Sequence, residues 1–136
     1  MRTSIEVRTP GRGLVEVTGE LRDLVRQSGV REGTCLVFVR HTSASLVIQE
    51  NADPSAGRDL VAFFDHLVPD GDPSFEHSAE GPDDMPAHIR SALTRTSESL
   101  IIASSELLLG TWQGVFLFEH RRRPHRRTLD VLISSA

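Results

Sequence analysis

The stretch HTSASLVIQENADP, residues 41–54, is the most informative part of this chain. It follows strand-forming residues, Cys35 to Val39, and supplies a histidine, hydroxyls, carboxylates and amides in quick succession. Burying such groups without partners would cost on the order of 1–3 kcal/mol each. We therefore expect them at the exposed end of a strand, where they can meet a ligand. The stretch closes on Asp53-Pro54, which predicts a helix start because an aspartate cap precedes proline in the first turn.

Two further runs share this polar character. Residues 75–88 read FEHSAEGPDDMPAH, and residues 109–121 begin with LGTWQG and end with EHR. A fold that brings the three runs together would make one polar pocket rich in histidine, carboxylate and arginine.

Hydrophobic periodicity predicts an α+β fold for the whole chain. We expect strands near residues 4–8, 14–17, 34–40, 45–49, 100–103, 107–109, 114–118 and 128–133. Residues 45–49 are a candidate hairpin partner of 34–40. Helices are expected from a Thr18 cap to about Gly29, from Asp53 to about Val68, and from Pro86 to about Leu93. The expected architecture is a mixed or antiparallel β-sandwich with about three helices, in a single domain over residues 1–136.

The composition limits the available chemistry. All 15 basic residues are Arg, and there is no Tyr. The absence of Lys excludes a Schiff-base lysine and the P-loop lysine. The single cysteine, Cys35, lies in an apolar strand and excludes an intramolecular disulfide. Acid–base catalysis is left to His, Asp and Glu.

Charge is spread unevenly along the chain, whose net charge is −4 and whose pI is about 5.8. Acids dominate residues 50–90, which suits a cation, whereas residues 121–127 hold five arginines and no acid. That basic run suits a phosphate or the acidic surface of a neighbouring subunit, or it is a solvated turn. The basic run contains no aromatic residue, which disfavours nucleic-acid binding. No apolar run approaches a membrane span and no signal region is evident, so we expect a cytoplasmic protein.

Four histidines fall in loops or at the ends of elements: His41, His77, His88 and His120. Neutral imidazole suits zinc and related metals, and three protein ligands are usual in catalytic zinc sites. The spacing matches no standard zinc motif, so these residues are either metal ligands or hydrogen-bonded loop histidines.

The acids have competing roles. Asp53 caps a helix or serves a site, and Asp83-Asp84 either caps the third helix or holds Mg²⁺. Glu80 has no structural duty that the sequence reveals. Glu119 ends an apolar strand, so it pairs with an arginine or serves a site.

Other polar side chains are candidates for ligand binding. Thr42 and Ser43 are suited to donate hydrogen bonds to an anion, and no Gly-x-Ser-x-Gly motif marks a serine nucleophile. Trp112 is either a core residue or a stacking surface for a planar ring. Arginines can bind phosphate through two parallel hydrogen bonds.

Taken together, these motifs resemble the YjbQ-like family, a small bacterial and archaeal family linked to a secondary thiamine-phosphate synthase activity. The residues that carry the resemblance are His41 to Ser45, Asn51 to Pro54, His77 with Glu80-Gly81, Asp83 to His88, Leu109 to Gly114, and Glu119 to Arg121.

The resemblance implies a β-sandwich with helices, a homotrimer with sites near subunit interfaces, and a metal-type site at His41, His77 and His88. The divalent metal would be Zn or Mg. The family often has an aromatic residue at the position of His120, which argues against His120 as a ligand. The candidate catalytic residues are Glu80, Asp53 and Glu119. The candidate substrate-binding residues are Thr42, Ser43, Asn51, Arg90, Trp112, Gln113 and Arg121.

The implied reaction joins hydroxymethylpyrimidine pyrophosphate to a thiazole phosphate and releases pyrophosphate. That chemistry needs a cation, arginines and hydroxyls for the leaving group, and an aromatic such as Trp112 or Phe75 against the pyrimidine. Two other functions compete. One is a metal-dependent hydrolase of a phosphorylated or amide-containing metabolite, with Glu80 or Asp53 as base. The other is a non-catalytic trimeric metabolite-binding protein.

Overall fold

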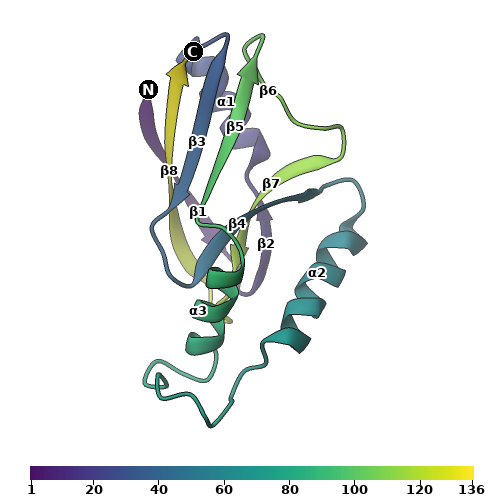
Figure 1. Cartoon of the computed structure of the whole chain (residues 1–136), viewed down its shortest axis with the longest axis vertical. Helices are drawn as coiled ribbons and strands as arrows, with labels where there is room; N and C mark the ends of the chain where they lie inside the picture. Colours follow the sequence, from purple (N-terminus) through teal and green to yellow (C-terminus); the bar gives the residue numbers. More distant parts are fainter.

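Residues 1–136 form two antiparallel sheets and three helices in a computed structural model (Figure 1). The strands are β1 (Arg2–Thr9), β2 (Gly13–Glu16), β3 (Gly33–Val39), β4 (Ala44–Glu50), β5 (Ser97–Ala103), β6 (Glu106–Leu107), β7 (Gln113–Glu119) and β8 (His125–Ser135). The helices are α1 (Thr18–Ser28), α2 (Pro54–Leu67) and α3 (Asp84–Leu93). None of the three is long and apolar enough to cross a lipid bilayer.

The larger sheet has the strand order β1-β8-β3-β5-β6 and the smaller has β2-β7-β4. Alternate residues of the central strands point into the main core: Cys35, Val37 and Val39 do so on β3. Leu46 on β4 and Leu117 on β7 meet them from the smaller sheet. The predicted α+β class, with two packed sheets and three helices, is confirmed.

The hairpin expected between residues 34–40 and 45–49 is absent. β3 pairs with β5 and β8, whereas β4 pairs with β7, so the two strands belong to different sheets. The physical reason is that β4 is buried on both of its faces. Ala44 to Val47 are all buried, because β4 has the large sheet on one face and helices on the other.

The start of α1 differs from the prediction by one residue. Val17 occupies the N-cap position, and Thr18 is already helical and buried. The Thr18 hydroxyl accepts a hydrogen bond from the backbone N–H of Val115 at 2.9 Å, so it ties the helix to β7 rather than capping it. Gly29 ends α1 as predicted, with φ +71° in the left-handed region that suits glycine.

The start of α2 confirms the Asp53 cap, whose carboxylate accepts from the backbone N–H of Ser55 at 2.9 Å. Phe64 packs edge-to-face on Phe118 of β7, with ring centroids 5.4 Å apart. Phe63 and Leu67 on the same helix remain 59% and 54% exposed.

Glu119, at the end of β7, is a fully buried carboxylate that accepts five hydrogen bonds. Two come from the guanidinium of Arg127 and one from the Thr9 hydroxyl at 2.6 Å. The backbone N–H groups of His120 and Arg121 supply the others, at 3.1 and 3.2 Å. Burial alone would raise the pKa of Glu119, but the hydrogen bonds from Arg127 and Thr9 outweigh it and hold the pKa below its ordinary value.

Replacing Arg127 by Met should lower the free energy of unfolding by about 3–5 kcal/mol, because it leaves a buried carboxylate without its partner. Urea unfolding at pH 7 measures the change. The matched control is Arg126→Met, at a position whose side chain is 69% exposed, where we expect less than about 0.5 kcal/mol. Adding Glu119→Gln to Arg127→Met should recover part of the loss. Equal losses for Arg126→Met and Arg127→Met would contradict this role of Glu119.

Candidate metal centre

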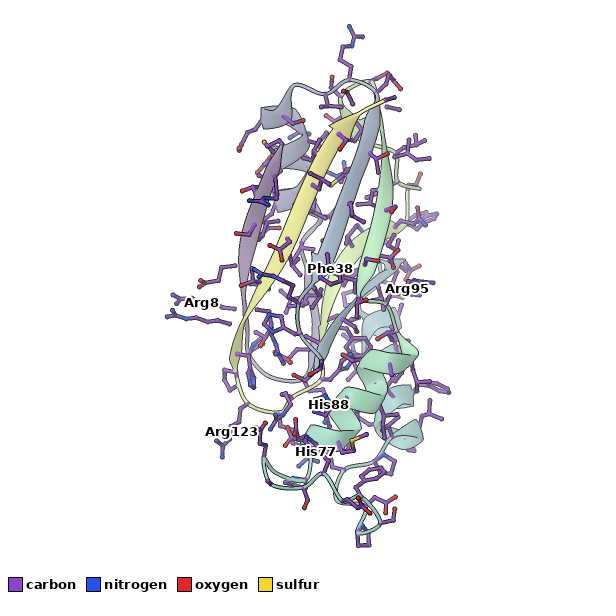
Figure 2. All side chains as sticks on the ribbon, turned by 60° about the vertical axis from the view of Figure 1, so that its left-hand side comes forward. Arg8, Phe38, His77, His88, Arg95 and Arg123 are labelled. Atoms are coloured by element: carbon purple, nitrogen blue, oxygen red, sulfur yellow. The ribbon has the colours of Figure 1, made fainter.

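The beginning of α3 brings an aspartate and a histidine onto one face. Asp84 and His88 are four residues apart in the helix, which places their side chains one above the other. The loop between α2 and α3 folds back so that His77 lies beside them (Figure 2). Gly81 makes this possible, since its φ of +111° lies in a region that side chains disfavour.

His77, Asp84 and His88 form a compact group whose ligand atoms all lie within 4.8 Å of one another. The Nε2 atom of His77 is 2.8 Å from one oxygen of Asp84, and Nε2 of His88 is 3.3 Å from the other. The two imidazole rings are 5.2 Å apart. Asp84 is buried, His88 half-buried and His77 exposed, so the group opens to solvent on the His77 side.

The Asp84 carboxylate has a buried oxygen, Oδ2, that accepts no hydrogen bond. The Nε2 atom of His77 lies 2.8 Å from Oδ2, but the orientation of the imidazole does not suit a hydrogen bond. Buried oxygens without partners are uncommon and call for an explanation such as an ion. Two imidazoles and a carboxylate suit zinc or a related transition metal, whereas Mg²⁺ prefers oxygen ligands. The residues therefore fit a transition-metal ion.

His88 is held in the tautomer that metal binding requires. Its Nδ1 atom lies 2.9 Å from the carbonyl oxygen of Thr42, which can only accept, so Nδ1 carries the proton. The lone pair of a neutral ring is then on Nε2, facing Asp84. Metal-binding histidines are commonly oriented by such a hydrogen bond to a backbone carbonyl.

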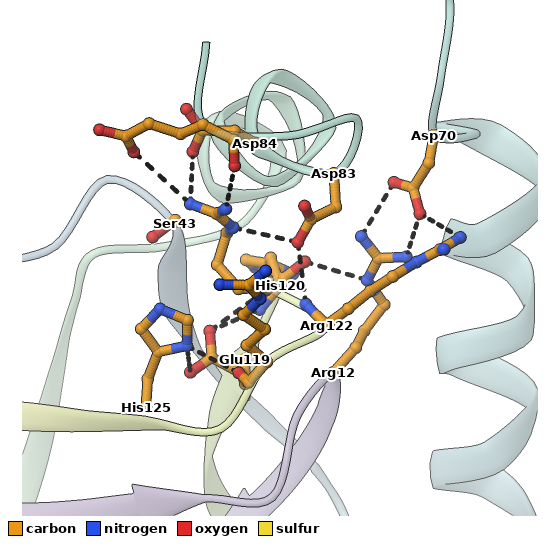
Figure 3. Close-up of polar contacts among 12 residues, drawn as sticks. Arg12, Ser43, Asp70, Asp83, Asp84, Glu119, His120, Arg122 and His125 are labelled. Carbon is orange, nitrogen blue, oxygen red and sulfur yellow. Dashed lines mark hydrogen bonds and ion pairs between the residues drawn. The ribbon is translucent and has the colours of Figure 1, made fainter. Parts of the chain in front are cut away.

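Arg121 fixes the acids from the other side. Its guanidinium donates to Asp83 at 3.0 Å, to Asp84 at 2.8 Å and to the carbonyl of Glu80 at 2.8 Å (Figure 3). Partial burial would lower the pKa of Arg121, but the hydrogen bond with Asp83 and the charges of the three acids raise it above its ordinary value. The hydrogen-bonding nitrogens of Arg121 are thus engaged, and the residue positions the acids instead of standing free for a substrate phosphate.

Asp83 occupies the N-cap position of α3 but makes no cap hydrogen bond. Its carboxylate instead accepts from the Arg121 side chain and from the backbone N–H of Arg122. Burial raises its pKa, and these hydrogen bonds more than offset that, so the pKa is lowered overall. The helix also begins at Asp84, two residues before the predicted start at Pro86.

His41 lies outside the group of three within this chain. Its Nε2 atom accepts the backbone N–H of Thr128 at 3.1 Å, and its pKa is lowered by burial and by the charge of Arg127. The neighbouring Ser43 is tied to the same arginine, which donates to its hydroxyl at 3.0 Å. Thr42 contributes through its backbone carbonyl to His88.

His120 is a core residue, in line with the argument against it as a ligand. It is fully buried, its ring lies 4.4 Å from that of Phe118, and its Nε2 atom is 2.8 Å from the hydroxyl of Ser45. Burial lowers the pKa of His120 to about 3, so the ring is neutral near pH 7.

The three polar runs do not form one pocket within one chain. Their residues are divided between the two ends of β4. β4 has seven residues, so at about 3.3 Å per residue its ends are roughly 20 Å apart. Ala44 pairs with Glu119 near the metal group, whereas Glu50 pairs with Gln113 at the far end. Four predicted site residues lie at that far end: Asn51, Asp53, Trp112 and Gln113.

The far-end residues have structural contacts of their own. The Asn51 amide donates to Glu16, and the Gln113 side chain accepts from the backbone N–H of Gly110. Asp53 caps α2, and its backbone hydrogen bond from Ser55 lowers its pKa. Trp112 is 64% exposed, which excludes the core alternative within this chain.

The two remaining acid and base candidates differ in exposure. Glu80 projects into solvent beside Arg121, 3.7 Å from it, and stays available as a base near the metal group. Of the two roles that the sequence allowed for Glu119, the structure shows the ion pair: Arg127 binds both of its carboxylate oxygens. Arg90 is 1% exposed and donates to Asp65 at 3.0 Å.

Sequence reasoning did not assign Asp84 as a partner of the two histidines. The signal was present, because Asp84 and His88 are four residues apart, but a helix start placed at Pro86 concealed it. Arg12 was missed entirely, although it lies among the acids beside this site.

Comparison with known proteins settles the family. The family model for UPF0047 protein YjbQ-like matches residues 3–135. The chain belongs to the YjbQ-like family. A UPF0047 protein of Synechocystis is 56% identical over 128 residues, which are 94% of this chain and 87% of the relative. UPF0047 protein YjbQ of Escherichia coli O157:H7 is 42% identical over 106 residues, 78% of this chain and 74% of the relative.

Solved structures agree with this YjbQ-like fold. A hypothetical protein from Aeropyrum pernix K1 superposes with a TM-score of 0.91 at 27% identity, covering 100% of this chain and 99% of that one. A YjbQ/UPF0047 family protein from Clostridium acetobutylicum superposes with a TM-score of 0.84 at 34% identity, covering 98% and 99%. These similarities show the family and the fold, and the names state no activity.

Metal analysis tests the centre directly. Mass spectrometry of the purified YjbQ-like protein should find about one zinc or similar ion per chain, as one three-ligand site predicts. His77→Ala and Asp84→Asn should lose it, because each removes a ligand. His66→Ala is the control, since this exposed histidine lies on α2.

His41→Ala separates the structural site from the set of three histidines suggested by the sequence. It should keep its metal, because His41 is outside the group. Loss of metal in His41→Ala, with retention in Asp84→Asn, would reverse the assignment. A metal-free wild type that stays so after incubation with zinc would mean that the two histidines contact Asp84 without a metal ion.

Proposed function

We propose that this chain is a metal-dependent enzyme acting on a phosphorylated metabolite at the His77, Asp84 and His88 group. The observation that carries the proposal is the buried Asp84 oxygen without a hydrogen-bond partner, 2.8 Å from the His77 imidazole. A metal ion held there would stabilise the negative charge that develops on phosphate oxygens during the reaction. We also propose that the protein is cytoplasmic, the location expected from the sequence.

The specific reaction that we propose is the alkyl transfer implied by family resemblance. The thiazole nitrogen attacks the methylene carbon of hydroxymethylpyrimidine pyrophosphate, the carbon–oxygen bond breaks, and pyrophosphate leaves with the electron pair. A hollow of about 390 Å³ beside His77 supports this choice, because it is lined by Phe75 and Met85. Phe75 is suited to stack on a pyrimidine, whereas Trp112 lies at the far end of β4.

A metal-dependent hydrolase is the second candidate, favoured by the position of Glu80. Its side chain is 72% exposed beside Arg121 and engaged in no hydrogen bond of its own. A carboxylate in that position can take a proton from an attacking water. Asp53 is less suited to this role, since it caps α2 at the far end of β4.

Pyrophosphate release decides between the two reactions. With both thiamine precursors present, the wild-type protein should form thiamine phosphate and pyrophosphate in equal amounts. Asp84→Asn should lower the rate at least about 100-fold, because it weakens charge stabilisation in the transition state. Glu76→Gln, in the same loop as His77, is the control and should stay within twofold of wild type.

Each other outcome identifies an alternative. Phosphate or pyrophosphate released from one precursor alone, and lost in Glu80→Gln, would support the hydrolase. If the protein binds its metal and the precursors but turns over neither precursor, the enzyme proposal is contradicted and a metabolite-binding protein is favoured.

We also propose that the protein is a homotrimer. Support comes from the outer face of the large sheet, where apolar side chains remain exposed (Figure 2). Phe38 and Leu132 are 42% and 44% exposed, Ile101 is 60% exposed, and Leu36 lies directly opposite Leu132. Adjacent exposed apolar residues of this kind are typical of a subunit interface.

Sedimentation velocity tests the trimer and the face together. The wild type should sediment as three chains of 15.0 kDa each, and Leu132→Asp should shift it toward monomer because a buried unpaired charge disfavours association. Leu67→Asp, an exposed leucine on α2, is the control and should stay trimeric. A monomeric wild type would contradict the proposal, and dissociation by Leu67→Asp alone would place the interface on α2.

A further inference from the structure

A second polar cavity lies beside the metal group, where the loop after α2 meets the turn between β7 and β8. Its volume is about 540 Å³, and five of its six lining residues are charged. The lining residues are Arg12, Asp65, Pro69, Asp70, Arg90 and Arg122. Three guanidinium groups face two carboxylates, which leaves the cavity one positive charge in excess.

Arg90 is the least satisfied of these groups. It is 1% exposed and donates to Asp65 and to the carbonyl of Val68, but its Nε–H has no partner. Burial and the nearby charge of Arg12 both lower its pKa. An additional anion in the cavity would relieve this unfavourable environment.

Asp70 already occupies the position of a bound oxyanion. Arg12 donates to its two oxygens, each at 3.0 Å, and Arg122 pairs with the same carboxylate (Figure 3). Burial would raise the pKa of Asp70, but the hydrogen bond and charge of Arg12 hold it below its ordinary value. Two guanidinium groups on one carboxylate is an arrangement that also suits phosphate.

We propose that this cavity binds a phosphate or pyrophosphate group through Arg12, Arg90 and Arg122, with Asp70 as an internal competitor. The cavity and the metal group are linked through Asp83 and Asp84, which do not themselves line the cavity. The backbone N–H of Arg122 binds Asp83, and Arg121 binds both Asp83 and Asp84. In Figure 3, Asp83 lies between Asp84 and the contact of Arg12 with Asp70. The inference names a phosphate subsite, and to that extent it rests on the proposed function.

Calorimetric titration of the metal-free protein with pyrophosphate and with inorganic phosphate tests the subsite. Wild type should bind pyrophosphate more tightly than phosphate, because two phosphoryl groups can reach more guanidinium donors. Arg122→Gln should weaken binding about tenfold through loss of a charge-assisted contact. Asp70→Asn should tighten binding several-fold by removing the competitor, and a thermal melt of each variant confirms folding. Arg123→Gln, the exposed neighbouring arginine, should match wild type.

The reverse pattern overturns the inference. Affinity unchanged in Arg122→Gln and Asp70→Asn would place the anion elsewhere, as would an equal loss in Arg123→Gln. The titration extends to about 10 mM pyrophosphate because that concentration reaches even weak, millimolar affinities. No heat of binding over this range would mean that there is no such site. These outcomes are independent of the metal, and pyrophosphate binding retained in His77→Ala would show that the subsite stands without the metal centre.

Discussion

The structure depends on one buried carboxylate, that of Glu119. By accepting the backbone N–H groups of the next two residues, it fixes the direction in which the chain leaves β7. By pairing with Arg127, it fixes where β8 begins on the other side of the turn. A buried ion pair contributes little net stability by itself, since desolvation offsets much of the attraction. What it provides here is a defined geometry for the turn between β7 and β8.

That geometry explains how two adjacent aspartates can stand side by side at the start of α3. Asp83 and Asp84 would repel each other, and the exposed N-terminal amides of a helix offset only part of that repulsion. Arg121 reaches from the turn to both carboxylates, and the backbone of Arg122 adds a further donor to Asp83. One Asp84 oxygen is thereby engaged, while Oδ2 is left free toward His77. The fold thus supplies a carboxylate with one free oxygen to the two histidines.

Periodicity and capping signals were sufficient for most local structure. Alternation identified the strands, Asp53-Pro54 marked the start of α2, and Gly29 marked the end of α1. Of the three histidines expected at one site, the fold brings His77 and His88 together, and their role as metal ligands stays a prediction. Strand pairing was not predictable from local pattern, because nothing in residues 44–50 indicates a partner more than sixty residues away. The long pairing of β4 with β7 separates Asn51 and Trp112 from the histidines.

The use of arginine in place of lysine matters for the geometry of the ion pairs at this site. Arg121 makes three directed hydrogen bonds to three acceptors, and Arg127 and Arg12 each bind both oxygens of one carboxylate. A planar guanidinium can meet such sets of acceptors at once, whereas an ammonium acts as a point charge at the end of a flexible stem. The basic run at residues 121–127 is therefore not a uniform charged surface. Arg121, Arg122 and Arg127 bind different carboxylates, and their spacing along the turn sets which acid each one reaches.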